Sequence, residues 1–343
     1  MTTQTQKHSG ESFVATFLPD LLFAEEPAGS SCLSEQTVFR VSAPFDELIG
    51  ISNWRERVIK PLRMSLAGVV WKTEMILQNS DVDNGVQTAA WGHLTGIFKS
   101  SWCGLKATNE SVTVRIGIVA EIAGSAVNRC TVMIDLVDLA VQTFQPLTTK
   151  ALGDSVIWPS PRLEHAGDHD PSTLAIVREM QLALHDSAKT REEMLAADHL
   201  QYWAEDFVWA GPGGIGVTHG RTGFVDCHQL PFRRAFPDRK GGGVLPSNGA
   251  SESAGHFVKF ADGRWAVTGG WPSMVATHLG DGWLGLSASE KKIVLRVFDF
   301  YEVVDSRITM NWVFIDIVDF LRQINQLPKY VHGYQQAKEG TQT

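Results

Sequence analysis

The sequence repeats itself, and this repeat constrains the fold more than any other feature of the 343 residues. Residues 102–142 align without a gap to residues 283–323, at a constant shift of 181. Thirteen of these 41 positions are identical, and nearly half of the others exchange one apolar residue for another. A second block, Pro61 to Arg63, aligns with Pro231 to Arg233 at a shift of 170. We therefore expect two copies of one fold.

The segment between the two copies has the composition of a linker. Residues 149–172 are rich in Pro, Ser, Asp and His and have no hydrophobic periodicity. We expect a first domain over 1–148, this linker, a second domain over 173–331 and a polar tail over 332–343. The length of the chain suits two ordinary domains.

Hydrophobic periodicity predicts the elements of each copy. The second copy is expected to hold two helices over 173–209 broken near His185, a short helix ending near Phe236, two strands over 255–271 that turn at Asp262–Gly263, a hairpin of 292–303 and 307–315, and a helix from Asp316. The first copy is expected to have only a shortened N-terminal helix, around 13–23. Helices followed by a bent antiparallel sheet and a final helix make an α+β fold.

Composition narrows the kind of partner. The formal net charge of -8 argues against a nucleic-acid-binding protein, because such binding needs clustered Lys and Arg. The N-terminus is polar, and no stretch approaches the length of a membrane span, so a cytoplasmic protein without a membrane partner is expected. The four cysteines form no C-x-x-C pair, which favours reduced thiols over a metal site. Eleven tryptophans are enough to fill cores or line a ligand cavity.

Both faces of the strand over 292–303 are largely apolar. One face carries Leu295, Val297, Asp299 and Tyr301, and the other carries Phe298 and Phe300 among others. A strand of this kind is expected to be covered on both sides. We expect the helices of its own domain to cover one face and the sister domain to cover the other, so that the two sheets pack as an internal pseudo-dimer.

The second copy resembles a known family. Its run from Trp283 to Ser289, the strand with Arg296, the stretch from Asn311 to Asp316 and the residue Gln323 are similar to those of the SnoaL-like polyketide cyclases. The resemblance implies two tandem cone-shaped α+β barrels of the cystatin-like or nuclear transport factor 2-like superfamily, which also holds ketosteroid isomerase. It further implies a pocket closed at one end, in which a buried carboxylate moves protons beside a carbonyl without a cofactor or metal.

Two aspartates are candidates for that carboxylate. Asp299 interrupts an apolar strand face, and its counterpart in the first copy is Ile118, which suggests a role specific to the second copy. The alternatives are a solvent-exposed edge position or a salt bridge. Asp316 matches the position at which the resemblance places the acid/base aspartate. It also precedes a helix with Asp319 three residues on, as a helix cap would, and Asp135 repeats this arrangement in the first copy.

Polar and aromatic residues without a clear twin gather in the second copy, which we expect to hold the working site. His278 is a further catalytic candidate, because a neutral His can hydrogen-bond an enolate oxygen; structural roles for such histidines stay open. The substrate-binding candidates are Trp209, His219, His256, Trp271, Arg296, Trp312 and Phe314.

Two motifs are set aside. Residues 211–216 match the pattern G-x-G-x-x-G, but they follow a predicted helix and open no second one, so we expect a rigid turn rather than a dinucleotide site. His165, Asp168, His169 and Asp170 are metal-ligand types, but they lie in the linker.

Two functions follow as hypotheses. The first is a cofactor-free enzyme that carries out aldol-type cyclisation, isomerisation or dehydration on a small apolar or polyketide-like substrate. The second is a small-molecule-binding or scaffolding protein of the same fold without chemistry. A deep cavity with a carboxylate at its floor favours the first, and a shallow groove favours the second. In either case the expected partner is a small molecule, and pairing into a homodimer stays open.

Overall fold

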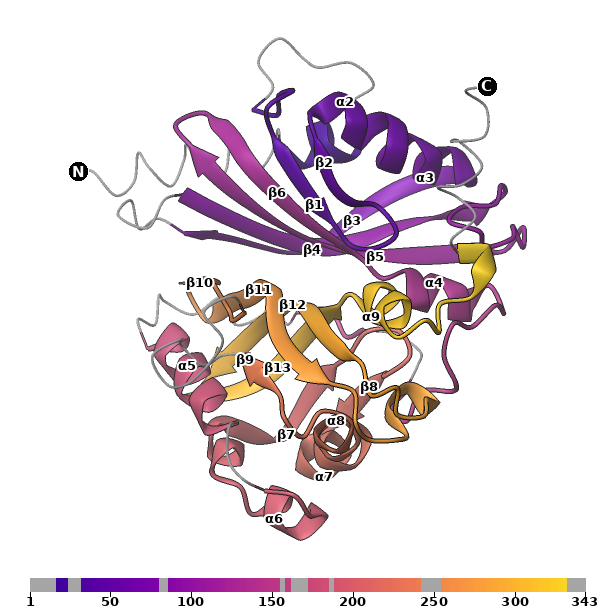
Figure 1. Ribbon diagram of the computed structural model, residues 1–343. Coiled ribbons are helices and arrows are strands. Elements are labelled where there is room, and N and C mark those ends of the chain that lie inside the picture. Colours follow the sequence, from indigo (N-terminus) through magenta and orange to yellow (C-terminus); the bar gives the residue numbers. More distant parts are fainter. Residues whose placement is uncertain are drawn as a thin grey trace, which may run out of the picture. The chain divides into compact units, whose positions relative to one another are not determined.

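A computed structural model describes residues 17–23, 32–79, 86–154, 158–161, 172–184, 188–241 and 254–331 (Figure 1). The chain divides into two compact units, one formed by residues 1–134 with 329–343 and the other by residues 135–328. The predicted helix break near His185, the polar tail over 332–343 and the metal-ligand types from His165 to Asp170 lie outside the described residues.

The first unit is a six-stranded sheet with one long, interrupted helix. Its strands are β1 (Val38–Val41), β2 (Asp46–Ile49), β3 (Leu66–Asn79), β4 (Val86–Phe98), β5 (Ser111–Ala123) and β6 (Ala126–Ile134). They lie in the order β2-β1-β6-β5-β4-β3, and β1 runs parallel to β6. The helix consists of α2 (Ile51–Trp54), a π-helical turn η1 (Arg55–Ile59) and α3 (Lys60–Ser65), and residues 17–22 are also helical.

The second unit repeats this architecture. Its strands are β7 (Trp203–Ala210), β8 (Val217–His219), β9 (Lys240–Gly241), β10 (Val258–Asp262), β11 (Trp265–Thr277), β12 (Lys292–Val304) and β13 (Arg307–Ile315). Its helices are α4 (Leu136–Gln142), α5 (Thr173–Ala183), α6 (Arg191–Leu195), α7 (Gly220–Phe224), α8 (Leu230–Ala235) and α9 (Ile317–Gln323). It also has the 3₁₀ turns η4 (Asp198–Tyr202) and η7 (Trp283–Gly285) and, between α7 and α8, the π-helical turn η5 (Val225–Gln229). Six strands follow the order β10-β11-β12-β13-β7-β8, and β9 pairs with β11.

The two sheets confirm the duplicated α+β fold that the repeat predicts. The order β8-β7-β13-β12-β11-β10 matches β2-β1-β6-β5-β4-β3 strand for strand. The parallel pair recurs as well, since β7 runs parallel to β13 as β1 does to β6. Each sheet is therefore mixed rather than purely antiparallel. How one sheet packs against the other stays a prediction.

The shared Pro block explains a shared distortion. Pro61 and Pro231 each lie in the first turn of a helical segment that directly follows a π-helical turn. A proline inside a continuous α-helix would remove one hydrogen bond and clash with the carbonyl four residues earlier. The wider π turn accommodates the ring in both copies, so the helix continues through it.

The helix expected up to residue 209 was a wrong prediction. Residues 203–210 form strand β7, in which Trp203, Phe207 and Trp209 on one face are buried while Asp206 on the other face is exposed. This two-residue alternation and the aromatic content fit a strand paired with β13, and tertiary pairing decided the outcome. Residues 211–216 consequently join two strands, β7 and β8. The glycine motif is thus a turn, as predicted, but it follows a strand and not a helix.

Other elements of the second copy are confirmed. The turn at Asp262–Gly263, the hairpin of β12 and β13 and the helix after Asp316 lie where the periodicity places them. Both faces of β12 are buried, as expected. On one face Phe300 contacts Phe314, whose ring in turn meets Trp158 from the segment predicted as a linker. Among the described residues, no helix is long and apolar enough to cross a membrane.

Candidate active site

A cavity of about 150 Å³ lies inside the second unit, between its sheet and its helices. The sheet side is formed by β7, β11, β12 and β13, and the helix side by α5 and the α7–η5–α8 segment. The lining residues that the argument below uses are Gln181, Trp209, Phe224, His228, Phe232, Arg239, His256, Ser273, Asp299, Tyr301 and Asn311.

The strand register explains why the polar side chains of the sheet meet. Trp209 on β7 lies opposite Asn311 on β13, and Asn311 lies opposite Tyr301 on β12. Because neighbouring strands are about 4.8 Å apart, these three residues form a continuous row on the cavity face. Asp299 lies two residues before Tyr301 on the same face of β12, opposite Thr268 of β11.

Asp299 is the carboxyl group of this cavity. It is buried, with 8% of its surface exposed, on a strand whose cavity face is otherwise formed by Leu295, Val297 and Tyr301. Burial raises the pKa of Asp299 to about 7, against a smaller opposing effect of the hydrogen bond with Asn311. The carboxyl group can therefore both accept and release a proton near neutral pH.

A network of hydrogen bonds surrounds the carboxyl group. The side-chain amide nitrogen of Gln181 lies 2.8 Å from Oγ1 of Thr268 and 3.2 Å from the hydroxyl of Tyr301. His256 joins this network, with Nδ1 at 2.8 Å from Thr268 Oγ1 and Nε2 at 2.8 Å from Oγ of Ser273. His256 Nε2 also faces Oδ2 of Asp299 at 3.9 Å, too far for a direct hydrogen bond.

A β-bulge brings Ser273 into the cavity. The pairing of β11 with β12 is regular up to Gly270 and resumes at Met274, so three residues bulge out of register. A bulge changes the direction in which a side chain points. Here Ser273 lines the cavity and contacts His256.

The first unit lacks these polar groups. At the shift of 181, Asp299 corresponds to Ile118, Tyr301 to Ala120 and Asn311 to Cys130. Ala90 lies opposite Ile118, where the second unit has Thr268 opposite Asp299. The β4–β5 pairing also runs without a register shift, so the bulge belongs to the second unit.

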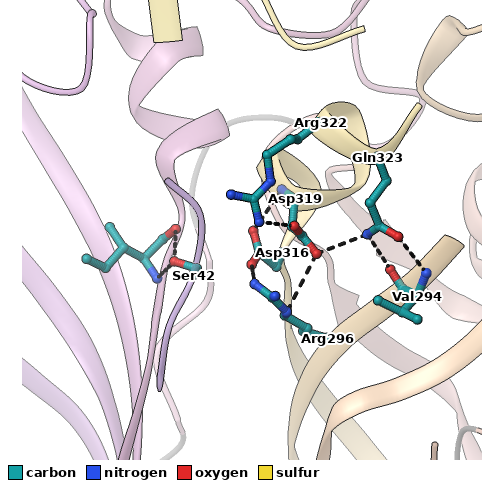
Figure 2. A network of polar contacts seen from close by, with 8 residues as sticks. Ser42, Val294, Arg296, Asp316, Asp319, Arg322 and Gln323 are labelled. Atoms are coloured by element: carbon teal, nitrogen blue, oxygen red, sulfur yellow. Dashed lines mark hydrogen bonds and ion pairs between the residues drawn. The ribbon is translucent and has the colours of Figure 1, made fainter. Parts of the chain in front are cut away.

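Asp316 has the geometry of a helix cap (Figure 2). Its Oδ1 accepts a hydrogen bond from the backbone N–H of Asp319 at 3.0 Å, and its Oδ2 accepts one from Nη1 of Arg296 at 3.1 Å. Nε of Arg296 lies 3.5 Å from Asp319, and the side chain of Gln323 bonds both backbone groups of Val294. Asp316 does not belong to the cavity lining.

The cap recurs in the other copy of the repeat. Oδ1 of Asp135 accepts a hydrogen bond from the N–H of Asp138, and Gln142 bonds Asp138 as Gln323 bonds Asp319. A contact that both copies share is explained by folding, so the structure favours the capping alternative for Asp316.

The structure brings three of the predicted site residues to the cavity, namely Asp299, Trp209 and His256. His278 is elsewhere: it is buried against Phe236 and Phe320, with Nδ1 at 3.1 Å from Oγ of Ser289. Burial lowers the pKa of His278, so its imidazole is neutral at neutral pH. His219 is exposed at the start of α7.

The remaining predicted residues lie on the sheet face that is turned away from the cavity. The guanidinium carbon of Arg296 lies 4.4 Å from the centre of the Trp271 ring, which is a cation–π contact. Trp312 donates its indole N–H to the carbonyl of Pro159 at 2.7 Å. Phe314 packs edge-on against Trp158, with the ring centres 4.8 Å apart. These contacts stabilise the sheet.

Sequence reasoning missed several cavity residues. Tyr301 and Asn311 carried a usable signal, because Tyr301 shares the face of Asp299 and Asn311 has no polar twin in the first copy. Gln181, His228 and Ser273 carried none, since a helix packing and a bulge bring them to the site. Among the described residues, no group of three or more His, Cys, Asp or Glu side chains could hold a metal ion.

Comparison with known proteins gives similar folds. No protein-family model matches the chain, and no curated protein matches it. The similar solved structures include a protein described as a SnoaL-like polyketide cyclase from Jannaschia sp. (17% identity, 39% of this chain and 90% of that one, TM-score 0.30), a nuclear transport factor 2-like protein from Burkholderia thailandensis (15%, 39% and 96%, 0.31) and a protein with a ketosteroid isomerase-like fold from Catenulispora acidiphila in complex with trimethylamine (12%, 39% and 93%, 0.30).

Proposed function

We propose that the second unit is a cofactor-independent acid–base enzyme that acts next to the carbonyl group of a small apolar substrate. The observation that carries the proposal is the buried carboxyl group of Asp299, which lines the cavity of the second unit and has a pKa of about 7. A base whose pKa lies near the working pH combines a useful ionised fraction with a strong tendency to take up a proton.

The first chemical step is proton abstraction. The ionised carboxylate of Asp299 removes a proton from the carbon next to the carbonyl, so a C–H bond breaks and an O–H bond forms on Asp299. The electron pair of the C–H bond passes into an enolate. Return of the proton from Asp299 to another carbon gives isomerisation. Attack of the enolate on a second carbonyl forms a C–C bond, and the new alkoxide takes the proton from Asp299, which gives cyclisation. Departure of a β-hydroxyl that takes this proton and leaves as water gives dehydration.

Neighbouring residues are suited to support this step. Asn311 donates one amide hydrogen to the backbone carbonyl of Phe300 and hydrogen-bonds Asp299, so it is a positioning residue for the carboxylate. The hydroxyl of Tyr301 accepts a hydrogen bond from Gln181 and also hydrogen-bonds Thr268, and it carries a proton of its own. A substrate carbonyl in this cavity could accept that proton's hydrogen bond as negative charge develops on the oxygen.

The experiment is exchange of the α-protons of cyclohexanone in D₂O, followed by NMR. We expect exchange above the buffer rate in the full-length protein, and its loss in Asp299→Asn. Asp305→Asn is the matched control, because Asp305 is exposed in the turn of the same hairpin. Exchange at the buffer rate in the unmodified protein, or an Asp299→Asn variant as active as the control, would contradict the proposal.

A further inference from the structure

The helix side of the cavity carries an imidazole that the proposed chemistry does not use. His228, in the π-helical turn η5, stacks on Trp209 with ring centres 3.9 Å apart and an interplanar angle of 15°. The rings of Phe224 and Phe232 lie 5.5 and 5.4 Å from it. Trp209, Phe224, His228 and Phe232 all line the cavity, and we call them the aromatic wall.

The polar edge of this imidazole has no protein partner on one side. His228 is 8% exposed, and its Nδ1 is buried without a hydrogen bond to any described protein group. Buried nitrogen atoms are normally paired, because leaving them unpaired is costly. A phenylalanine would fill the same aromatic surroundings without that cost. The presence of histidine therefore calls for a use of its nitrogen atoms.

The charge of the imidazole limits what it can bind. Burial lowers the pKa of His228 to about 3, and the nearby Arg233 acts in the same direction. The ring is consequently neutral in the pH range in which Asp299 titrates. A neutral imidazole offers one N–H donor and one acceptor, which suits a hydroxyl or carbonyl and gives no ionic attraction to a carboxylate.

The other charges of the cavity agree with an uncharged ligand. Among the described lining residues, the formally charged side chains are those of Asp299 and Arg239. Asp299 would repel a carboxylate once it is ionised. Arg239 contacts the carbonyl oxygen of Phe236 through Nη1 at 3.5 Å, so part of its guanidinium faces the protein.

The size of the cavity fits a single ring. Its volume of about 150 Å³ equals that of an engineered apolar cavity that admits benzene, also about 150 Å³. The aromatic wall offers a flat ring both stacking and edge contacts.

We propose that His228 is a substrate-recognition residue, whose neutral imidazole hydrogen-bonds an uncharged oxygen of a flat, one-ring substrate lying against the aromatic wall. The assignment rests on the proposed function in one respect, because it takes the cavity of Asp299 as the substrate site. It adds the class of substrate, an uncharged cyclic ketone, enol or phenol.

The test measures binding of phenol, toluene and benzoate to the full-length protein by NMR titration. We expect phenol to bind about three- to ten-fold more tightly than toluene, as one net hydrogen bond allows, and benzoate to bind more weakly than phenol. His228→Phe should remove the preference for phenol and leave toluene binding unchanged. His228→Asn keeps a polar group at this position and should retain part of the preference for phenol. Arg234→Ala, an exposed change on α8, is the control.

Stability separates recognition from a structural role. His228→Phe removes a buried polar edge from an aromatic cluster, so its melting temperature should equal or exceed that of the unmodified protein. The proposal is overturned if phenol shows no saturable binding in the millimolar range, if benzoate binds best, or if His228→Phe weakens phenol and toluene alike.

The two proposals fail in different ways. If phenol selection depends on His228 while Asp299→Asn leaves ketone exchange unchanged, recognition stands and the proposed chemistry falls. If exchange depends on Asp299 while the phenol preference survives in His228→Phe, the chemistry stands and recognition by His228 falls. Asp299→Asn should bind phenol in both cases, because the variant keeps the cavity and the aromatic wall.

Discussion

Thr268 lies directly opposite Asp299 in the antiparallel pair of β11 and β12. Its hydroxyl oxygen is 2.8 Å from Nδ1 of His256, and Nε2 of the same ring is 3.9 Å from Oδ2 of Asp299. The strand register thus places the hydroxyl of Thr268 beside the carboxyl group of Asp299. The same hydroxyl orients the imidazole of His256, which faces that carboxyl group. The equivalent pair of the first copy, Ala90 and Ile118, has no polar side chain.

Asp299→Asn is expected to change how stability depends on pH. The folded protein keeps the Asp299 proton up to about pH 7, while the unfolded chain releases it near the ordinary value of 3.8. The free energy of unfolding therefore falls as the pH rises from 3.8 to about 7 and does not recover above it. The variant lacks this fall and should be more stable than the unmodified protein by a few kcal/mol at about pH 8.

Urea unfolding at about pH 4 and pH 8 checks this result. Other carboxyl groups titrate over the same range, so the quantity to compare is the difference between the two proteins at each pH. Asp305→Asn, an exposed change in the turn of the same hairpin, is the control for the effect of the substitution itself. An Asp299→Asn difference that is equal at both pH values would mean that Asp299 ionises in the folded protein as it does in water.

Asn311→Leu is expected to shift the pH profile of catalysis. The hydrogen bond from Asn311 lowers the pKa of Asp299, partly opposing the effect of burial. Loss of that bond should raise the pKa further, so the ionised base appears only at higher pH. In a plot of the ketone-exchange rate against pH, the rise on the acid side should move to higher pH. The plateau rate should be less affected. An unshifted rise would show that Asn311 acts on packing alone.

The sequence was informative where the signal is local. Asp299 could be found because a single strand shows its alternation, and the comparison with Ile118 showed that the carboxyl group is unique to one copy. Trp312 was expected at the ligand because its counterpart in the first copy, Thr131, is not aromatic. That difference does not show which face of the sheet Trp312 lies on. That face follows from the pairing of Asn311 with Tyr301, a register that no local pattern contains.

Longer-range pairing limited the rest of the prediction. Strand β7 is held by parallel pairing with β13, about a hundred residues further along the chain, so its eight residues read as the end of a helix. Ser273 reaches the cavity only because β11 bulges, and Gln181 only because α5 packs over the sheet. Each of these depends on the assembled unit.

Substitutions at Asp316 should separate its cap from its ion pair. Asp316→Asn keeps an oxygen for the backbone N–H of Asp319 but removes the charge that faces Arg296. Asp316→Ala removes both, and should destabilise by about a further 1 kcal/mol through the lost cap. Both variants should lower the melting temperature and keep cyclohexanone exchange when assayed well below it. Abolished exchange in a fully folded Asp316→Asn protein would instead favour a catalytic Asp316.

Gly213→Ala is expected to destabilise the second unit. The N–H of Gly213 donates to Oδ2 of Asp135 at 2.9 Å, and a Cβ at this position would meet the backbone nitrogen of Asp138 at 2.2 Å. Backbone on both sides must shift to relieve that contact, so a loss of the order of 1–3 kcal/mol is expected. Gly223→Ala is the opposite case, because its Cβ would meet Thr218 at 3.7 Å inside helix α7. There alanine should stabilise by up to about 1 kcal/mol. Thermal unfolding of the two variants should therefore move in opposite directions, and equal shifts would show that the turn at Gly213 yields freely.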